Sequence, residues 1–165
     1  MTLETDFISG LRAIATDPGA RGLMDDAAML GDLVLTHDMI VEGVHFLPDD
    51  APADVAWKLL AVNLSDLAAK GAVPLGVLMG AGLTRDAAWN AAFVEGLSAA
   101  VAELRVPLLG GDTVKMPHGA PRAFGLTAIG RAMGTVPSRI GARPGDTLYV
   151  LGNIGDAGLG LRIAR

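Results

Sequence analysis

Two kinds of apolar pattern alternate along the chain, and this alternation constrains the fold more than any other feature of the sequence. Helical spacing marks residues 3–16, 53–70 and the stretch from Trp89 to Leu104. Short runs rich in Val, Leu and Gly predict strands at 33–36, 72–83, 106–109, 122–133 and 147–151. Because helices alternate with strands, the sequence predicts an α/β or α+β fold.

Local signals place the ends of these elements. Asp17-Pro18-Gly19 should end the first helix, and Thr84 is a candidate N-cap for the helix that contains Trp89. Residues 38–47 are predicted to be a loop with a second extended piece. A last helix is expected to begin at Gly155 and to be cut off at Arg165, which suggests a truncated chain.

Composition limits the classes of protein to which the chain can belong. The 165 residues are 51% hydrophobic and 19% charged, which is typical of one compact domain. The net charge of −5 argues against a broad nucleic-acid surface. Since the chain has no cysteine, disulfides and thiolate metal sites are excluded. No apolar run reaches the roughly 18 residues of a membrane span, and the first ten residues do not resemble a secretory signal.

Acidic residues stand at the ends of the predicted elements, at Asp25 and Asp26, Asp38, Asp66 and Asp112. Magnesium prefers carboxylate oxygens and shares its coordination sphere with waters and substrate phosphates. Convergence of these side chains would therefore form a magnesium site. The alternative for each is local, since aspartate is favoured at turns and helix caps.

Asp66 is the hardest of these to explain locally, because it lies on a mostly apolar helix, three residues after Asn63. A carboxylate there is costly unless it binds a metal or pairs with a cation. Lys70, four residues later, offers a simple helical ion pair, so both interpretations remain open.

Glycines and a histidine add two weaker candidates. Gly110-Gly111-Asp112 follows a predicted strand, where glycine would allow backbone N–H groups to approach a phosphate, although no GxxxxGK[ST] motif is present. His45 lies in a predicted loop that could face a ligand. No serine, histidine and acid form a recognisable nucleophilic set.

Six stretches together resemble the thiamine-monophosphate kinase family. They are residues 25–28, 36–46 with VEGVHF, 58–69 with AVNLSDLAA, 109–113 with GGDT, 139–146 and 152–156. Their order and spacing hold from about residue 20 to the end of the chain. Aminoimidazole ribonucleotide synthetase and selenophosphate synthetase belong to the same superfamily.

The resemblance implies a fold and an activity. The fold would be the N-terminal domain of the superfamily, a mixed sheet flanked by helices that pairs with a second copy to form a β-barrel in a homodimer. Residues 1–150 would form this ATP-binding, magnesium-binding and dimerisation domain, and residues 151–165 would begin a C-terminal domain. The family transfers the γ-phosphoryl group of ATP to thiamine monophosphate, giving thiamine diphosphate, with Mg²⁺ as cofactor. A cytoplasmic protein without nucleic-acid or membrane partners is expected.

The resemblance also assigns roles to residues. Asp26, Asp38, Asp66 and Asp112 resemble magnesium ligands, with Thr36 or the backbone of His37 also near the metal. Gly111, Asp112 and Arg139 resemble ATP-binding positions, and His45 resembles a substrate contact. No catalytic nucleophile is implied, because direct phosphoryl transfer depends on positioning and charge neutralisation.

Departures from the family pattern are few. His37 stands where threonine is usual, Lys70 where the residue is usually apolar, Val114-Lys115 where threonine and arginine are usual, and Ile140 where serine is common. The C-terminal half would supply another aspartate and most of the thiamine pocket, so the 165 residues alone are expected to be inactive. Two alternatives are a dimerisation or nucleotide-binding module without catalysis and a sister ATP-dependent enzyme of the superfamily.

Overall fold

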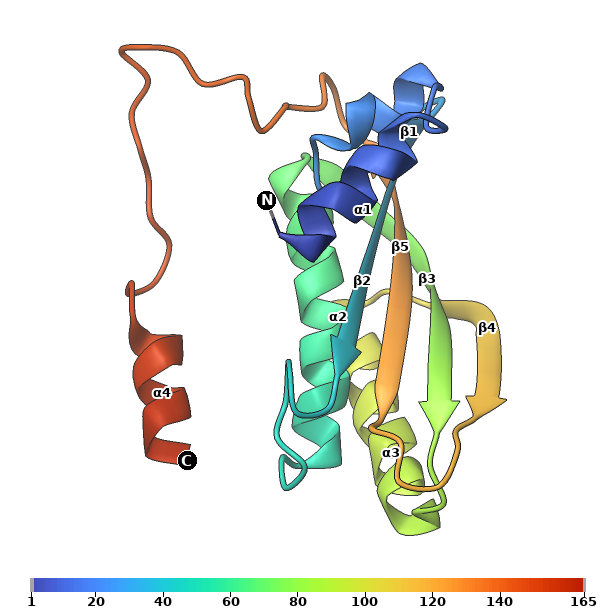
Figure 1. Cartoon of the computed structure of the whole chain (residues 1–165). Helices are drawn as coiled ribbons and strands as arrows, with labels where there is room; N and C mark the ends of the chain where they lie inside the picture. The colour runs from blue at the N-terminus through green and yellow to red at the C-terminus, as the bar shows by residue number, and fades with distance from the viewer. Residues whose placement is uncertain (1, 165) are drawn as a thin grey trace.

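A five-stranded mixed sheet forms the body of the molecule, and helices α2 and α3 pack together on one of its faces (Figure 1). The computed structural model describes residues 2–164. The strands lie in the order β1-β2-β5-β3-β4, with β3 and β4 parallel and the other neighbours antiparallel. This confirms the predicted mixed sheet flanked by helices. The elements are α1 (Leu3–Arg12), η1 (Pro18–Leu23), β1 (Ala28–Leu30), β2 (Leu33–Val41), α2 (Pro52–Ala69), β3 (Ala72–Leu83), α3 (Ala87–Leu104), β4 (Leu108–Lys115), β5 (Ala123–Ala132) and α4 (Asp156–Ala164).

The core lies between the sheet and α2. Alternate residues of a strand point to opposite faces, so Val34, Thr36 and Ile40 of β2 are buried beneath the helices. α2 buries one stripe of its surface against the sheet and α3, and this stripe consists of Val55, Ala56, Leu59, Leu60, Asn63 and Leu67. Towards the other end of the core, four aromatic rings pack together: Phe46, Trp89, Phe93 and Phe124. No helix within residues 2–164 is long and apolar enough to cross a membrane.

The opposite face of the sheet carries exposed apolar side chains, which we call the open face. Met39 of β2, Leu78 of β3 and Val114 of β4 lie on it, and they are 55%, 41% and 57% exposed. A long irregular segment follows β5 and leads to α4, which is drawn apart from the sheet in Figure 1.

Several element boundaries differ from those predicted. β2 continues through Asp38 to Val41, where a loop was expected, because β5 pairs with it along its whole length. The predicted strand 147–151 is irregular and exposed, since no described strand pairs with it. The N-cap of α3 is Asp86 rather than Thr84, because the Asp86 side chain accepts a hydrogen bond from Trp89 N.

The Gly110-Gly111-Asp112 stretch was expected to follow a strand, and it lies inside β4 instead. A Cβ on Gly111 would come within 1.8 Å of the backbone oxygen of Met79 in β3. The close approach of the two parallel strands therefore accounts for glycine at this position.

Candidate functional site

A polar group near the C-terminal end of α2 joins that helix to β2. Thr36 Oγ1 donates a hydrogen bond to Asp66 Oδ2 at 3.0 Å. Two residues further along β2, the backbone N–H of Asp38 donates to Asn63 Oδ1 at 3.0 Å. Asn63 is fully buried, and its side-chain nitrogen donates to Leu59 O within the same helix at 2.9 Å. These bonds fix the position of Asp66 against the strand.

The charges of two predicted metal-binding aspartates, Asp26 and Asp38, act on a third, Asp66. Burial raises the pKa of Asp66, the hydrogen bond from Thr36 lowers it, and the negative charges of Asp38 and Asp26 raise it again, with a net upward shift. A carboxylate whose ionisation is opposed by burial and by two neighbouring carboxylates is one that a divalent cation would stabilise. The donor set of Asp26, Asp38 and Asp66 therefore fits a magnesium ion.

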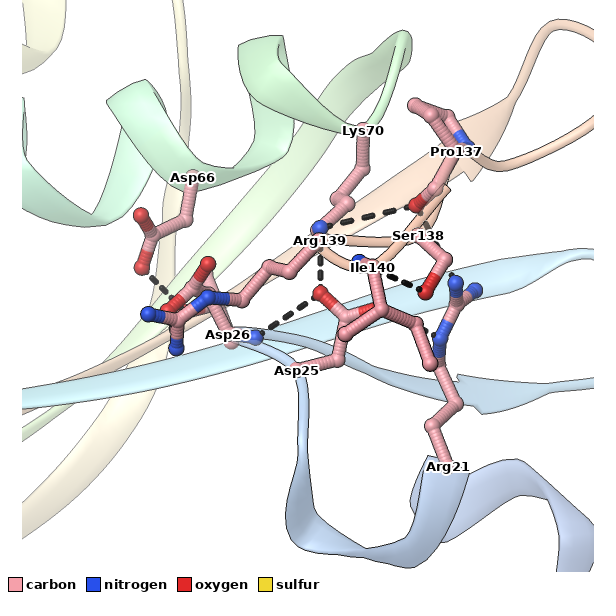
Figure 2. Close-up of polar contacts among 10 residues, drawn as sticks. Arg21, Asp25, Asp26, Asp66, Lys70, Pro137, Ser138, Arg139 and Ile140 are labelled. Carbon is pink, nitrogen blue, oxygen red and sulfur yellow. Dashed lines mark hydrogen bonds and ion pairs between the residues drawn. The ribbon is translucent and has the colours of Figure 1, made fainter. Parts of the chain in front are cut away.

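Arg139, the predicted ATP-binding arginine, extends over this acidic group. Its Nη1 lies 3.0 Å from Asp26 Oδ1, and both side chains are exposed (Figure 2). The pair joins the irregular segment after β5 to the segment before β1. A guanidinium here can accept a phosphate because its planar fork still offers donors beside the one that Asp26 receives.

Lys70 contacts Asp25, not Asp66. Its ammonium group forms an ion pair with Asp25 Oδ1, and both side chains are almost fully buried. Of the two alternatives left open for Asp66, the ion pair with Lys70 does not form, although the positive charge of Lys70 still lowers the pKa of Asp66. The sequence showed that Lys70 lies on a mostly apolar helix and therefore needs an anionic partner, but it did not identify Asp25 as that partner.

Asp112 lies on the other side of the sheet from Asp66. In register, Asp112 pairs with Gly80, Gly80 with Gly125 and Gly125 with Met39, so Asp112 lies on the open face. Asp38, one residue before Met39, points to the helix-covered face. β4 and β2 are separated by three strand spacings, about 14 Å. The structure brings together Asp26, Asp38 and Asp66 and leaves Asp112 apart from them.

His37 shares the open face with Asp112. Its Nδ1 lies 2.9 Å from Thr127 Oγ1 of β5. His37, Gly80, Asp112 and Gly125 line one depression of about 430 Å³. Thr36 points the other way, toward Asp66, so of these two candidate neighbours of the metal only Thr36 directs its side chain to the predicted aspartates.

His45 lies in the turn after β2, where Val41 N donates to its Nδ1 at 3.0 Å. Lys58 of α2 donates to the His45 backbone oxygen. Both residues line a pocket of about 440 Å³ to which Gly158 and Leu161 of α4 also contribute. The sequence predicted the loop position and a ligand-facing role for His45 but not the contact with Lys58.

No three His, Asp or Glu side chains among residues 2–164 are arranged as a ready-made metal site. To bind magnesium, the carboxylates would therefore have to move closer together, or waters and ligand phosphates would have to complete the coordination, as is usual for this ion.

A comparison with protein-family models decides the family. Residues 24–132 match the model described as AIR synthase related protein, N-terminal domain. The chain belongs to this family. The matched range of the AIR synthase related domain begins just before Asp25 and ends with β5, so it contains Asp26, Asp38, Asp66 and Asp112 but not Arg139.

The chain is also similar to curated thiamine-monophosphate kinases. That of Caulobacter vibrioides is 46% identical over 168 residues, which cover 96% of this chain and 47% of the relative. That of Escherichia coli K12 is 42% identical over 149 residues, covering 86% of this chain and 45% of the relative. The chain thus spans about half the length of the curated relatives that it matches.

Solved structures agree with this similarity. AaThiL complexed with AMPPCP and TMP superposes with a TM-score of 0.83 at 30% identity, covering 99% of this chain and 55% of that one. A thiamine monophosphate kinase structure from Aquifex aeolicus gives a TM-score of 0.81 at 30% identity, with 99% and 56% coverage. The backbone of this chain is therefore that of the corresponding part of these kinases.

Proposed function

We propose that this chain forms the nucleotide- and magnesium-binding part of a thiamine-monophosphate kinase, which transfers the γ-phosphoryl group of ATP to thiamine monophosphate and yields thiamine diphosphate and ADP. The observation that carries the proposal is the 46% identity with such a kinase across 96% of the chain. AaThiL binds AMPPCP, a nonhydrolysable ATP analogue, together with TMP, which supports the same pair of substrates here.

The acidic group supplies the chemistry that this reaction needs. Asp26, Asp38 and Asp66 would hold Mg²⁺, which neutralises phosphate charge and aligns the transferred group when it is bound. Thr36 would orient the Asp66 carboxylate through its 3.0 Å hydrogen bond. Arg139 would exchange part of its contact with Asp26 for a phosphate oxygen. His45 and Lys58, at the pocket beside α4, would contact thiamine monophosphate.

Asp112 and Gly111 fit the proposal less directly. Asp112 would reach a metal only if nucleotide binding rearranges β4 or if a site extends across the sheet edge. The close approach of Met79 already requires glycine at position 111, so the presence of glycine there does not by itself support a role in ATP binding.

Calorimetric titration of the chain with AMPPCP and magnesium tests this proposal. We expect binding, and we expect Asp66→Ala to weaken it at least tenfold, since a metal-bound carboxylate is worth more than about 1.4 kcal/mol. Asp32→Ala, an exposed aspartate in the β1–β2 turn, is the control and should retain affinity. Absence of binding by the unmodified chain contradicts the nucleotide site. Equal affinity of Asp66→Ala contradicts the metal assignment, and equal affinity of Asp112→Ala removes Asp112 from the site.

The same proposal includes organisation and location. Residues 1–150 would form the N-terminal domain and residues 151–165 the beginning of the next one. Two copies would pair through their sheets as a homodimer with a β-barrel at the interface, which is supported by the apolar residues on the open face. A cytoplasmic location is consistent with the absence of cysteine and with the use of ATP.

A non-catalytic dimerisation module is the second candidate, and the open face favours it. Such a module would dimerise but would not bind AMPPCP, so the titration above distinguishes it. A sister enzyme with another substrate would bind AMPPCP and fail a coupled assay with thiamine monophosphate when the full-length protein is used.

A further inference from the structure

A buried ion pair between Lys70 and Asp25 lies beside the acidic group, with 4% and 3% of the two side chains exposed. Arg21 completes the set, since its Nε lies 2.8 Å from Asp25 Oδ2. The two cations come from different elements, α2 and η1, and Asp25 lies between them (Figure 2).

Both cations also reach the same backbone oxygen. Lys70 Nζ donates to Pro137 O at 3.5 Å, and Arg21 Nη2 donates to it at 3.1 Å. Pro137 belongs to the irregular segment after β5, 67 residues from Lys70 and 116 from Arg21. We call Arg21, Asp25, Lys70 and the Pro137 carbonyl the clamp. It ties that segment to the body of the protein.

The clamp is connected to the acidic group at two points. Two residues after Pro137, Arg139 contacts Asp26. On the other side, Asp25 Oδ1 accepts a hydrogen bond from the backbone N–H of Asp26 at 3.0 Å. One buried carboxylate thus organises both the cations that hold the segment and the backbone of a proposed metal ligand.

We propose that Lys70 is a positioning residue for the nucleotide: through the Pro137 carbonyl it fixes the segment that places Arg139 over Asp26, Asp38 and Asp66. This rests on the proposed function for the role of Arg139 toward phosphate. Lys70 touches neither substrate nor metal in this scheme. Replacement of a buried ion pair by uncharged side chains of similar size is often neutral or stabilising, so geometry rather than fold stability is the property that the pair supplies.

The test uses Lys70→Met/Asp25→Asn, which removes the ion pair without leaving a buried charge of this pair alone. The asparagine oxygen can still accept from Asp26 N. The variant also removes the charge that pairs with Arg21, so it tests the clamp as a whole. We expect the affinity for AMPPCP with magnesium to fall about tenfold, the effect of one charge-assisted hydrogen bond. Arg139→Ala should lower the affinity for AMPPCP by a similar factor. The triple variant, Lys70→Met/Asp25→Asn/Arg139→Ala, should bind no more weakly than Arg139→Ala alone. A triple variant that is a further tenfold weaker shows that Lys70 does not act through Arg139, which overturns the proposal.

Two further variants separate positioning from stability. Lys70→Arg keeps the charge and the donors and should restore affinity to within about twofold of the unmodified chain. Arg131→Met/Asp32→Asn makes the same charge change at an exposed ion pair near the end of β5, where little effect is expected. Equal loss in this control overturns the specific role of the clamp.

Hydrogen exchange provides a measurement that needs no nucleotide. Ile140 N donates to Ser138 Oγ at 3.4 Å and Gly141 N donates to Ser138 O at 3.1 Å, so both amides report on the segment. We expect their exchange to become at least fivefold faster in Lys70→Met/Asp25→Asn and to be unchanged in the exposed-pair control. If the unmodified chain binds no AMPPCP, the proposed function fails while exchange still tests the clamp. Unchanged exchange at these amides overturns the clamp itself.

Discussion

The pKa of Asp25 is lowered and the pKa of Asp66 is raised, and the neighbours of each residue explain the difference. Burial raises the pKa of Asp25, but the hydrogen bonds from Lys70 and Asp26 N and the charges of Lys70 and Arg21 outweigh burial and lower it overall. Asp66 is also raised by burial, and its charged neighbours include Asp38 and Asp26, so its pKa remains raised. Asp25 is thus held ionised by cations within the protein, whereas Asp66 is left with a deficit of positive charge that a metal would supply.

This difference gives an expectation for pH dependence. A carboxylate whose folded pKa lies below its unfolded value of about 3.9 stabilises the fold above that value and loses its contribution as pH falls through the folded pKa. Asp25→Asn should therefore cost about 3 kcal/mol at pH 7, since it leaves Lys70 buried without its anion. Urea unfolding of both proteins at pH 7, 5 and 3 measures the difference.

The difference in unfolding free energy should be the same at pH 7 and 5 and smaller at pH 3. The contribution of Asp66 to stability has the opposite sign, because a raised pKa means that ionisation of this carboxyl destabilises the fold. Asp66 is present in both proteins, so its contribution cancels from the difference. A difference that is constant down to pH 3 would mean that ionised Asp25 is not its source.

At the scale of elements, α2 and α3 approach closely at a glycine. A Cβ on Gly96 of α3 would lie 2.4 Å from Ala53 Cα of α2, and that atom belongs to the backbone. We expect Gly96→Ala to destabilise the fold by about 2 kcal/mol, because overpacking exceeds the gain of about 1 kcal/mol in helix propensity. Thermal or urea unfolding measures this.

Gly10 of α1 is the matched control, since nothing lies within 4 Å of its added Cβ. Gly10→Ala should raise stability or leave it unchanged. If both glycines respond in the same direction, propensity rather than helix packing governs Gly96.

Sequence patterns predicted the elements better than their partners. Helical periodicity located α2, and runs rich in Val, Leu and Gly located β3 and β5. β4 was predicted too short because Gly110 and Gly111 resemble a loop locally. The close approach of Met79, which requires glycine at position 111, exists only in the folded sheet. Residues 147–151 were predicted as a strand because they are apolar. A strand also needs a neighbouring strand to pair with, and the local sequence does not show whether one is present.

The same limit applies to the site. The predicted aspartates Asp26, Asp38 and Asp66 do lie near one another, but the alternation that places Asp112 on the open face depended on a register that no local signal gives. Helical spacing offered Lys70 as a possible partner of Asp66, whereas its partner in the structure, Asp25, is distant in sequence.

At the scale of the whole molecule, residues 2–164 cover one face of the sheet and leave the other exposed. An antiparallel or mixed sheet tolerates one solvated face when that face is polar. Here Met39, Leu78 and Val114 are exposed in neighbouring positions, although Asp112, His37 and Thr127 interrupt them. Exposed apolar patches of this kind mark interaction surfaces, and a self-complementary sheet face suits a two-fold dimer.

The dimer proposed above therefore has a direct test in sedimentation equilibrium. We expect the unmodified chain to be a dimer at micromolar concentration and Leu78→Lys to be a monomer, because the lysine would place an unpaired charge inside the interface. The control is Leu148→Lys, which changes an exposed leucine of the irregular segment after β5 and should leave the dimer intact. Thermal unfolding of Leu78→Lys checks that the monomer is folded. A folded Leu78→Lys dimer would place the interface elsewhere, and a monomeric unmodified chain would contradict the dimer, leaving the open face to be covered by another part of the full-length protein.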